Sequence, residues 1–118
     1  MKVNYVTLGT NNRQQAEQFY DRLFADTAFQ KIYSEDRMTM WVNDGFMFAL
    51  AEPYDGNDAT VGNGSMVGFL MNSDTEVNRI HELALSLGAI DEGEPRVRSE
   101  HQSAYFRDLD GNKVCLFA

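Results

Sequence analysis

A single cysteine, Cys115, is present, so the chain can form no internal disulfide. One thiol in 118 residues fits a reducing compartment. The first residues enter a strand-like pattern without an apolar signal segment, and no apolar run approaches the roughly 20 residues that a membrane helix needs. We therefore expect a cytoplasmic protein with no membrane partner.

Basic residues are also scarce. Ten Lys and Arg stand against 18 Asp and Glu, which gives a formal net charge of −8. Nucleic-acid binding requires clustered Lys and Arg that contact phosphates, so we expect no nucleic-acid partner. An acidic surface keeps a small protein soluble, and it is also compatible with a cationic ligand.

Apolar residues are numerous enough for one core, since 43% of the chain is hydrophobic and 12% aromatic. The length suits a single domain spanning 1–118. Residues 2–9 alternate like a strand, and residues 11–25 predict a helix that Asn11 caps. The buried stripe predicted for this helix is Ala16, Phe19, Tyr20, Leu23 and Phe24. Three strands are predicted near 28–34, 37–43 and 46–52.

The same order of elements then repeats after a glycine-rich linker, residues 53–64. The second copy is predicted to contain a strand at 65–72, a helix at 73–87, a looser segment at 89–100, and strands at 102–107 and 112–118. Ser73 and Glu76 form a capping box at the start of the helix, and Gly88 provides a left-handed cap at its end. The predicted fold class is therefore α+β. It has two tandem βαβββ modules, residues 1–52 and 65–118, which must pair because neither buries enough surface alone.

The predicted strands have two different faces, because neighbouring side chains in a strand point in opposite directions. One face of each strand is large and apolar and should pack on the helices. The other face is smaller and mixed, with tyrosine, threonine, alanine, methionine, glycine and cysteine. Such a face is typical of a concave, partly apolar small-molecule site. The alternative is that a loop or a partner chain covers it.

Several motifs along the whole chain together resemble one known family. They are residues 3–9 (VNYVTLG), 17–20 (EQFY), 62–64 (GNG) and 104–113 (AYFRDLDGNK), in which Leu109 replaces the usual proline. These motifs resemble the vicinal oxygen chelate superfamily, which contains glyoxalases, bleomycin-resistance proteins and ring-cleaving dioxygenases. The resemblance implies an incomplete eight-stranded barrel around a central cleft. It also implies a homodimer, because small members of the family commonly pair.

The resemblance further implies where a divalent metal would bind, at central positions of the first, fourth, fifth and eighth strands. Those positions hold Tyr5, Ala49, Met66 and Cys115, and none is His or Glu. A catalytic divalent site needs nitrogen or carboxylate donors. We therefore expect no metal and no cofactor, and we place the four residues in the lining of a ligand site instead.

Other residues are candidates for the same lining. The further ligand-binding candidates are Thr7, Trp41, Met47, His101, Tyr105 and Arg107. Aromatic rings among them suit stacking on a flat ligand, and the guanidinium suits pairing with a carboxylate. The alternatives are structural aromatics, an exposed loop histidine, and an ion pair from Arg107 to Asp108 or Asp110. The sequence shows no base beside Cys115 to activate it, so we expect an unreactive thiol.

Two functions follow from these features, beside a third option in which the protein has no ligand of its own and acts through a homodimer. The first is a metal-independent protein that binds a small aromatic or cationic molecule, as bleomycin-resistance-type members of the family do. The alternative is an enzyme, a glyoxalase-like lyase or dioxygenase with a divalent metal at positions that the resemblance does not reveal.

Overall fold

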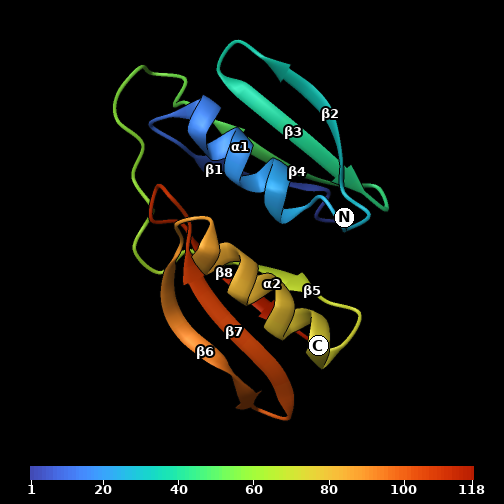
Figure 1. The fold of residues 1–118 in the computed structure, drawn as a ribbon. Helices are drawn as coiled ribbons and strands as arrows, with labels where there is room; N and C mark the ends of the chain where they lie inside the picture. The colour runs from blue at the N-terminus through green and yellow to red at the C-terminus, as the bar shows by residue number, and fades with distance from the viewer. The chain divides into compact units, whose positions relative to one another are not determined.

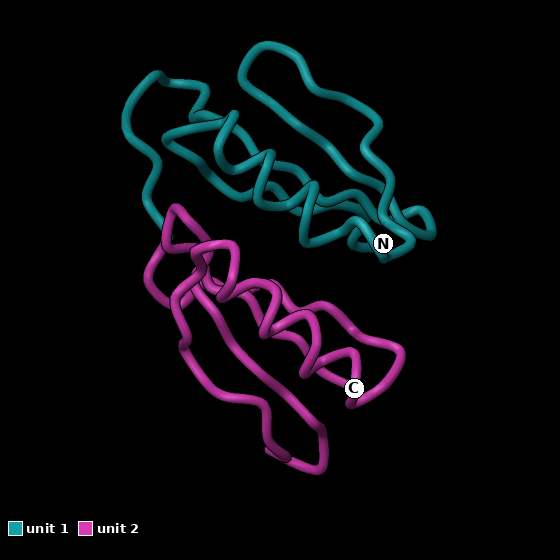
Figure 2. Tube along the Cα trace, viewed as in Figure 1, with its two compact units in different colours: residues 1–61 teal, residues 62–118 magenta.

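The computed structural model describes all of residues 1–118. Its contacts divide the chain into two compact units, unit 1 (Met1–Val61) and unit 2 (Gly62–Ala118), as Figure 2 shows. Each unit contains one helix and four strands in the same order (Figure 1). The predicted α+β duplication of two βαβββ modules is confirmed. Neither helix has the length and hydropathy that a membrane crossing requires.

Unit 1 is a four-stranded sheet with a helix on one face. Its elements are β1 (Tyr5–Gly9), α1 (Arg13–Leu23), β2 (Gln30–Glu35), β3 (Met38–Asn43) and β4 (Phe46–Ala51). The strand order is β1-β4-β3-β2, in which β1 runs parallel to β4 and the other pairs are antiparallel. The predicted stripe of α1 is buried throughout, because a helix gains most of its stability from packing its apolar face.

The N-terminus of α1 differs from the prediction by one residue. The cap is Asn12, whose side chain accepts a hydrogen bond from the backbone N–H of Gln15 at 3.1 Å. Asn11 was the wrong choice, because its side chain is engaged elsewhere. It donates to the carbonyl of Ala59 at 3.2 Å and accepts from the Ala59 amide at 2.7 Å. Asn11 thereby ties the end of unit 1 to the start of the helix.

An aromatic cluster fills the space between α1 and the sheet. Tyr20, Trp41 and Phe48 are each at most 1% exposed. The ring of Tyr20 lies 4.8 Å from that of Phe48 and 6.0 Å from that of Trp41, between centroids. Such pairs each contribute about 0.5–1.5 kcal/mol beyond their buried area. The expectation that Trp41 lies on the ligand-lining face is wrong, because the ring is packed beneath α1.

Unit 2 repeats this topology. Its elements are β5 (Val67–Leu70), α2 (Asp74–Ser86), β6 (Ile90–Arg98), β7 (His101–Arg107) and β8 (Lys113–Phe117), in the sheet order β5-β8-β7-β6. Ser73 caps α2 by accepting a hydrogen bond from the amide of Glu76 at 3.2 Å. The side chain of Glu76 turns to Arg79 instead of closing the box. Gly88 ends the helix with φ +106°, as predicted.

The looser segment predicted at 89–100 is instead mostly a strand, β6, nine residues long. It lies at the edge of its sheet and pairs only with β7, so Pro95 removes no hydrogen bond that a neighbour needs. Its register shifts between Asp91 and Gly93, and again between Gly93 and Arg96. These irregularities hide the two-residue period by which a strand is recognised in a sequence.

Candidate functional site

Each sheet has one face under its helix and a second face on the opposite side, which we call the far face of the unit. Side chains on directly paired residues of neighbouring strands lie on the same face, so the register assigns every residue. In unit 1 the far face consists of Tyr5, Thr7, Gln30, Tyr33, Glu35, Met38, Met40, Val42, Met47, Ala49 and Ala51. In unit 2 it includes Gly68, Gly93, Arg96, Arg98, His101, Ser103, Tyr105, Arg107, Lys113, Cys115 and Phe117.

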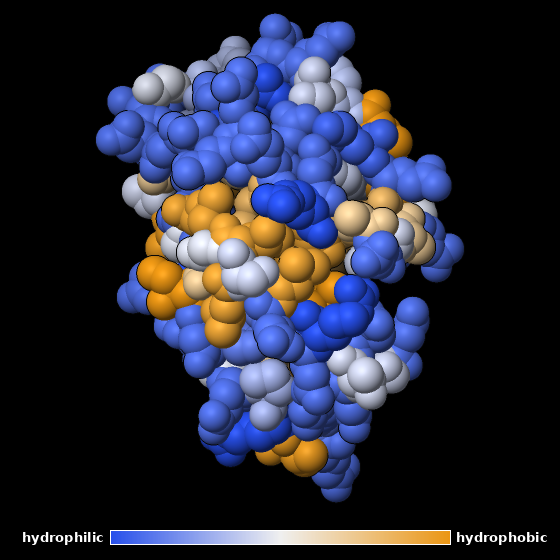
Figure 3. Space-filling model, viewed as in Figure 1, coloured by the Kyte–Doolittle hydropathy of each residue, from blue (hydrophilic) through white to orange (hydrophobic).

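The far face of unit 1 is apolar and rich in methionine. Tyr5 pairs with Met47 and Thr7 with Ala49, so the structure brings these four predicted residues together. Sequence reasoning missed the methionines of β3, Met38 and Met40, which are half-buried beside them. Flexible thioethers adapt to the shape of a guest, and methionine is common on binding surfaces for that reason. The helix side of the protein, which Figure 3 shows, has a mostly hydrophilic surface with apolar residues gathered in patches.

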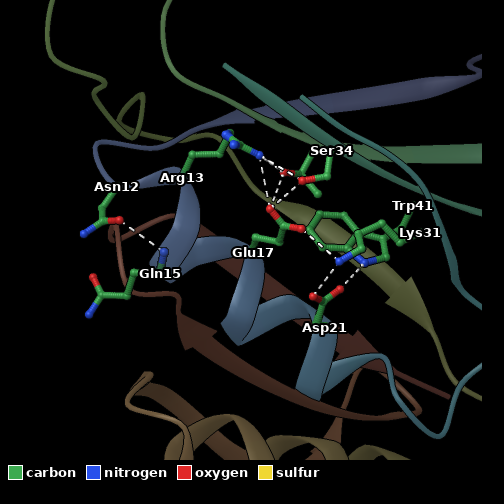
Figure 4. Close-up of polar contacts among 9 residues, drawn as sticks. Asn12, Arg13, Gln15, Glu17, Asp21, Lys31, Ser34 and Trp41 are labelled. Atoms are coloured by element: carbon green, nitrogen blue, oxygen red, sulfur yellow. Dashed lines mark hydrogen bonds and ion pairs between the residues drawn. The ribbon is translucent and has the colours of Figure 1, made fainter. Parts of the chain in front are cut away.

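The opposite side of β3 carries a polar network instead of a ligand site (Figure 4). The Oε2 atom of Glu17 on α1 accepts hydrogen bonds from Arg13 at 3.1 Å and from the fully buried Thr39 at 3.0 Å. Its other oxygen meets the Lys31 ammonium at 2.9 Å. Thr39, like Trp41, lies beneath the helix. This network joins α1 to β2 and β3.

Electrostatics keep the Glu17 carboxylate charged. Burial raises the pKa of Glu17, but hydrogen bonds from Lys31, Ser34 and Thr39 outweigh it, and the pKa falls below its ordinary value. The hydrogen bond of Lys31 to Glu17, with a further one to Asp21 at 2.9 Å, raises the pKa of Lys31. Both groups therefore stay ionised around neutral pH.

The far face of unit 2 has a different character, because cations surround an aromatic ring there. The Arg98 guanidinium carbon lies 5.2 Å from the centre of the Tyr105 ring, and the Lys113 Nζ atom lies 5.4 Å from it. Tyr105 pairs directly with Cys115, which in turn pairs with Gly68. The predicted residues Tyr105 and Cys115 are thus brought together, while Arg98 and Lys113 were missed. No local signal identifies Arg98, because the bulges of β6 set its position.

The cations do not activate the thiol. Burial raises the pKa of Cys115, and the lowering influences of Tyr105, Arg98 and Lys113 do not overcome it. The thiol is 7% exposed. Because the thiolate is the nucleophilic form, Cys115 is a poor nucleophile at neutral pH.

The remaining titratable candidates have structural partners. Arg107 meets Glu92 at 3.0 Å, where the sequence had suggested Asp108 or Asp110. His101 contacts the carbonyl of Ala118 at 3.1 Å through Nδ1. His81, on α2, is only 4% exposed. Its Nε2 atom lies 3.1 Å from an Asp91 carboxylate oxygen and 3.2 Å from the Tyr105 carbonyl. Both are acceptors, so this nitrogen carries the proton.

The residues at the metal positions of the family do not fit a divalent ion. Tyr5 and Met66 are 60% and 53% exposed, Ala49 has no donor atom, and Cys115 holds its proton. Within each unit, no group of three or more His, Cys, Asp or Glu side chains is arranged to hold a metal. Imidazole and carboxylate, the donors that a catalytic divalent ion requires, are missing from these positions.

Comparison with solved structures identifies the fold. A glyoxalase/bleomycin resistance protein from Albidiferax ferrireducens T118 is 29% identical, covers 97% of this chain and 95% of its own, and superposes with a TM-score of 0.90. A glyoxalase/bleomycin resistance protein/dioxygenase family enzyme from Burkholderia phytofirmans PsJN gives 0.82 at 15% identity, over 99% and 98% of the two chains. A fosfomycin resistance protein from Listeria monocytogenes gives 0.73 at 23% identity, over 100% and 90%.

Comparison by sequence finds no relative: no protein-family model and no curated protein matches this chain. The two neighbours below 25% identity show the fold alone. The Albidiferax protein adds close similarity over nearly the full length of both chains. The fold of this chain is therefore that of the glyoxalase, bleomycin-resistance and dioxygenase proteins of the vicinal oxygen chelate superfamily, and the resemblance carried by its motifs is confirmed.

Proposed function

We propose that this protein binds a small organic molecule on the far face of a sheet without the aid of a divalent metal. One observation carries the proposal. The four positions that would hold a metal in this superfamily are Tyr5, Ala49, Met66 and Cys115. A phenol, a methyl group, a thioether and a protonated thiol offer neither imidazole nor carboxylate.

The character of the two far faces supports binding. In unit 1, the half-buried Met47 pairs directly with the exposed Tyr5, and the half-buried Met38 and Met40 lie on the next strand, β3. Partly exposed thioethers and aromatic rings provide apolar contact area that a small guest can cover. The named neighbours include proteins of bleomycin and fosfomycin resistance. By that analogy, the proposed role is to bind and retain a small apolar or aromatic compound in the cytoplasm.

Metal content tests the first half of the proposal. The purified full chain is incubated with Ni²⁺, Zn²⁺, Mn²⁺ and Fe²⁺ in turn, desalted, and measured by elemental analysis. We expect no ion to remain at one per chain. Cys115→Ser is the matched control, because it removes the only thiol; a metal retained by wild type and lost from this variant is bound through Cys115.

A tightly held ion, one per chain and retained by Cys115→Ser, would contradict the proposal. If that loaded protein also isomerised the hemithioacetal of methylglyoxal and glutathione, or opened a catechol ring, the enzyme alternative would replace it. Ligand binding tests the second half: equilibrium dialysis against a panel of small aromatic compounds should find at least one that binds to the metal-free chain. A panel without any binder would contradict it.

A further inference from the structure

The basic residues of unit 2 are segregated onto one side of its sheet. Of its Lys and Arg residues, only Arg79 lies on the helix. The others, Arg96, Arg98, Arg107 and Lys113, lie on β6, β7 and β8. The register places all four on the far face. Acidic residues of unit 2 lie on α2, such as Asp74 and Glu76, and also on β6, which carries Asp91, Glu92 and Glu94.

Three of these cations, Arg96, Arg98 and Lys113, form no ion pair with a carboxylate. The fourth, Arg107, is paired with Glu92. Arg98 is instead held by neutral oxygens: it donates to the Ser103 carbonyl at 2.6 Å and to the Glu94 carbonyl at 2.9 Å. These bonds fix the guanidinium in place through neutral oxygens. The Asp91 carboxylate also feels its charge: the pKa of Asp91 is lowered mainly by a hydrogen bond from the Gly93 amide, with smaller contributions from His81 and Arg98. A guanidinium has five N–H donors, so some remain for a ligand.

Gly93 makes room for this arrangement. A Cβ atom at Gly93 would lie 2.8 Å from Cδ2 of Tyr105 and 3.2 Å from Nη2 of Arg98, both too close. The tyrosine ring and the guanidinium therefore both pack over the bare glycine, where a side chain would separate them. The two cations act together on the neighbouring residue as well, since Arg98 and Lys113 both lower the pKa of Cys115 against the larger effect of burial.

We infer that the ligand is an anion, and that the far face of unit 2 binds the carboxylate of a small aromatic acid between Arg98 and Lys113, with the aromatic part of the ligand against Tyr105. The inference rests on the proposed function and names its ligand class. It replaces the cationic ligand that the net charge of −8 suggested. Exposed charges that lie more than about 8 Å from a ligand are largely screened at physiological ionic strength. The cations next to the ligand therefore decide which sign of charge it carries.

Three matched probes test the inference with the full-length, isotopically labelled chain: 2-naphthoate, 2-naphthalenemethanol and 2-naphthylmethylamine. They share the ring system and differ in charge. Binding is followed by two-dimensional amide NMR, which reports the Kd and the residues affected. We expect 2-naphthoate to bind at least about tenfold more tightly than the amine, because like charges repel. The shifted amides should lie on β6, β7 and β8.

Variants then locate the site. Lys113→Ala should raise the Kd for 2-naphthoate about fivefold, which is the effect of losing one partly exposed ion pair. Arg79→Ala removes the same charge from the helix and should leave the Kd unchanged. Gly93→Ala should weaken binding by displacing Tyr105 and Arg98. The amide spectrum of each variant shows whether it is folded.

Different failures have different meanings. If the alcohol or the amine binds as tightly as 2-naphthoate, the anionic site is wrong while the proposed binding function stands. If Lys113→Ala binds like wild type while Arg79→Ala does not, the site lies elsewhere and the inference is also overturned. If none of the three probes binds, the inference fails, and the broader panel described above decides whether the proposed function fails with it.

Discussion

Replacing Glu17 with glutamine tests how unit 1 is held together. The carboxylate accepts hydrogen bonds from two charged groups, Arg13 and Lys31, and from the buried hydroxyl of Thr39. The side chain of Lys31 is 37% exposed, so its ion pair contributes only about 0.5 kcal/mol. The partly buried Arg13 pair and the Thr39 bond each add about 1 kcal/mol. Glu17→Gln should therefore lower the free energy of unfolding by about 2–3 kcal/mol.

Urea unfolding followed by tryptophan fluorescence measures this loss directly. Trp41 is the only tryptophan, and its Nε1 atom donates to Asp21 at 3.0 Å within the same network, so the signal reports on unit 1. Glu35→Gln is the matched control, because that exposed glutamate lies on the neighbouring strand and forms no ion pair. Its midpoint should equal that of wild type. If the urea midpoint of Glu17→Gln corresponds to a loss of unfolding free energy below about 0.5 kcal/mol, the role assigned to the network is refuted.

The pH dependence gives a second check on Glu17. Its pKa in the folded chain lies below its ordinary value near 4.5. Stabilisation from the carboxylate is therefore fully present above pH 4.5 and is lost as the pH falls through the lower folded value. The difference in unfolding free energy between wild type and Glu17→Gln should shrink over that acidic range. A difference that stayed constant down to the folded pKa would show that charge is not what Glu17 contributes.

A substitution in α2 and a chemical reaction of Cys115 test two other parts of the structure. Ser73→Ala removes the cap of α2 and should cost about 1 kcal/mol, measured by thermal unfolding; Ser86→Ala, at the other end of the helix, is the comparison. Equal stability of Ser73→Ala and wild type would contradict the cap. Cys115 should react with iodoacetamide at pH 7 more slowly than free cysteine, because burial raises its pKa. Faster reaction than free cysteine, in the folded chain, would show an activated thiol.

Local patterns were sufficient for the helices and for the duplication. The stripe from Ala16 to Phe24 has a clear helical period, and Ser73 with Gly88 marks both ends of α2. The start of α1 was ambiguous because two asparagines stand together. Only the contact of Asn11 with Ala59, 48 residues away, decides between them, and no local pattern contains that contact.

The site was predicted less well, and for identifiable reasons. The segment around Trp41 (MTMWV) is apolar at nearly every position, so alternation does not show which face meets the helix. Arg98 was missed because two register shifts in β6 determine which way it points. Tyr105 and Cys115 were placed correctly together, since β7 and β8 keep a regular two-residue period.

Metal-independent binding is the central claim, and one measurement tests it most directly. The affinity of the tightest aromatic ligand found for the full chain is measured twice, in excess EDTA and with Ni²⁺ or Zn²⁺ supplied. The account predicts Kd values that agree within about twofold. Binding that disappears in EDTA and returns with one equivalent of metal would contradict it.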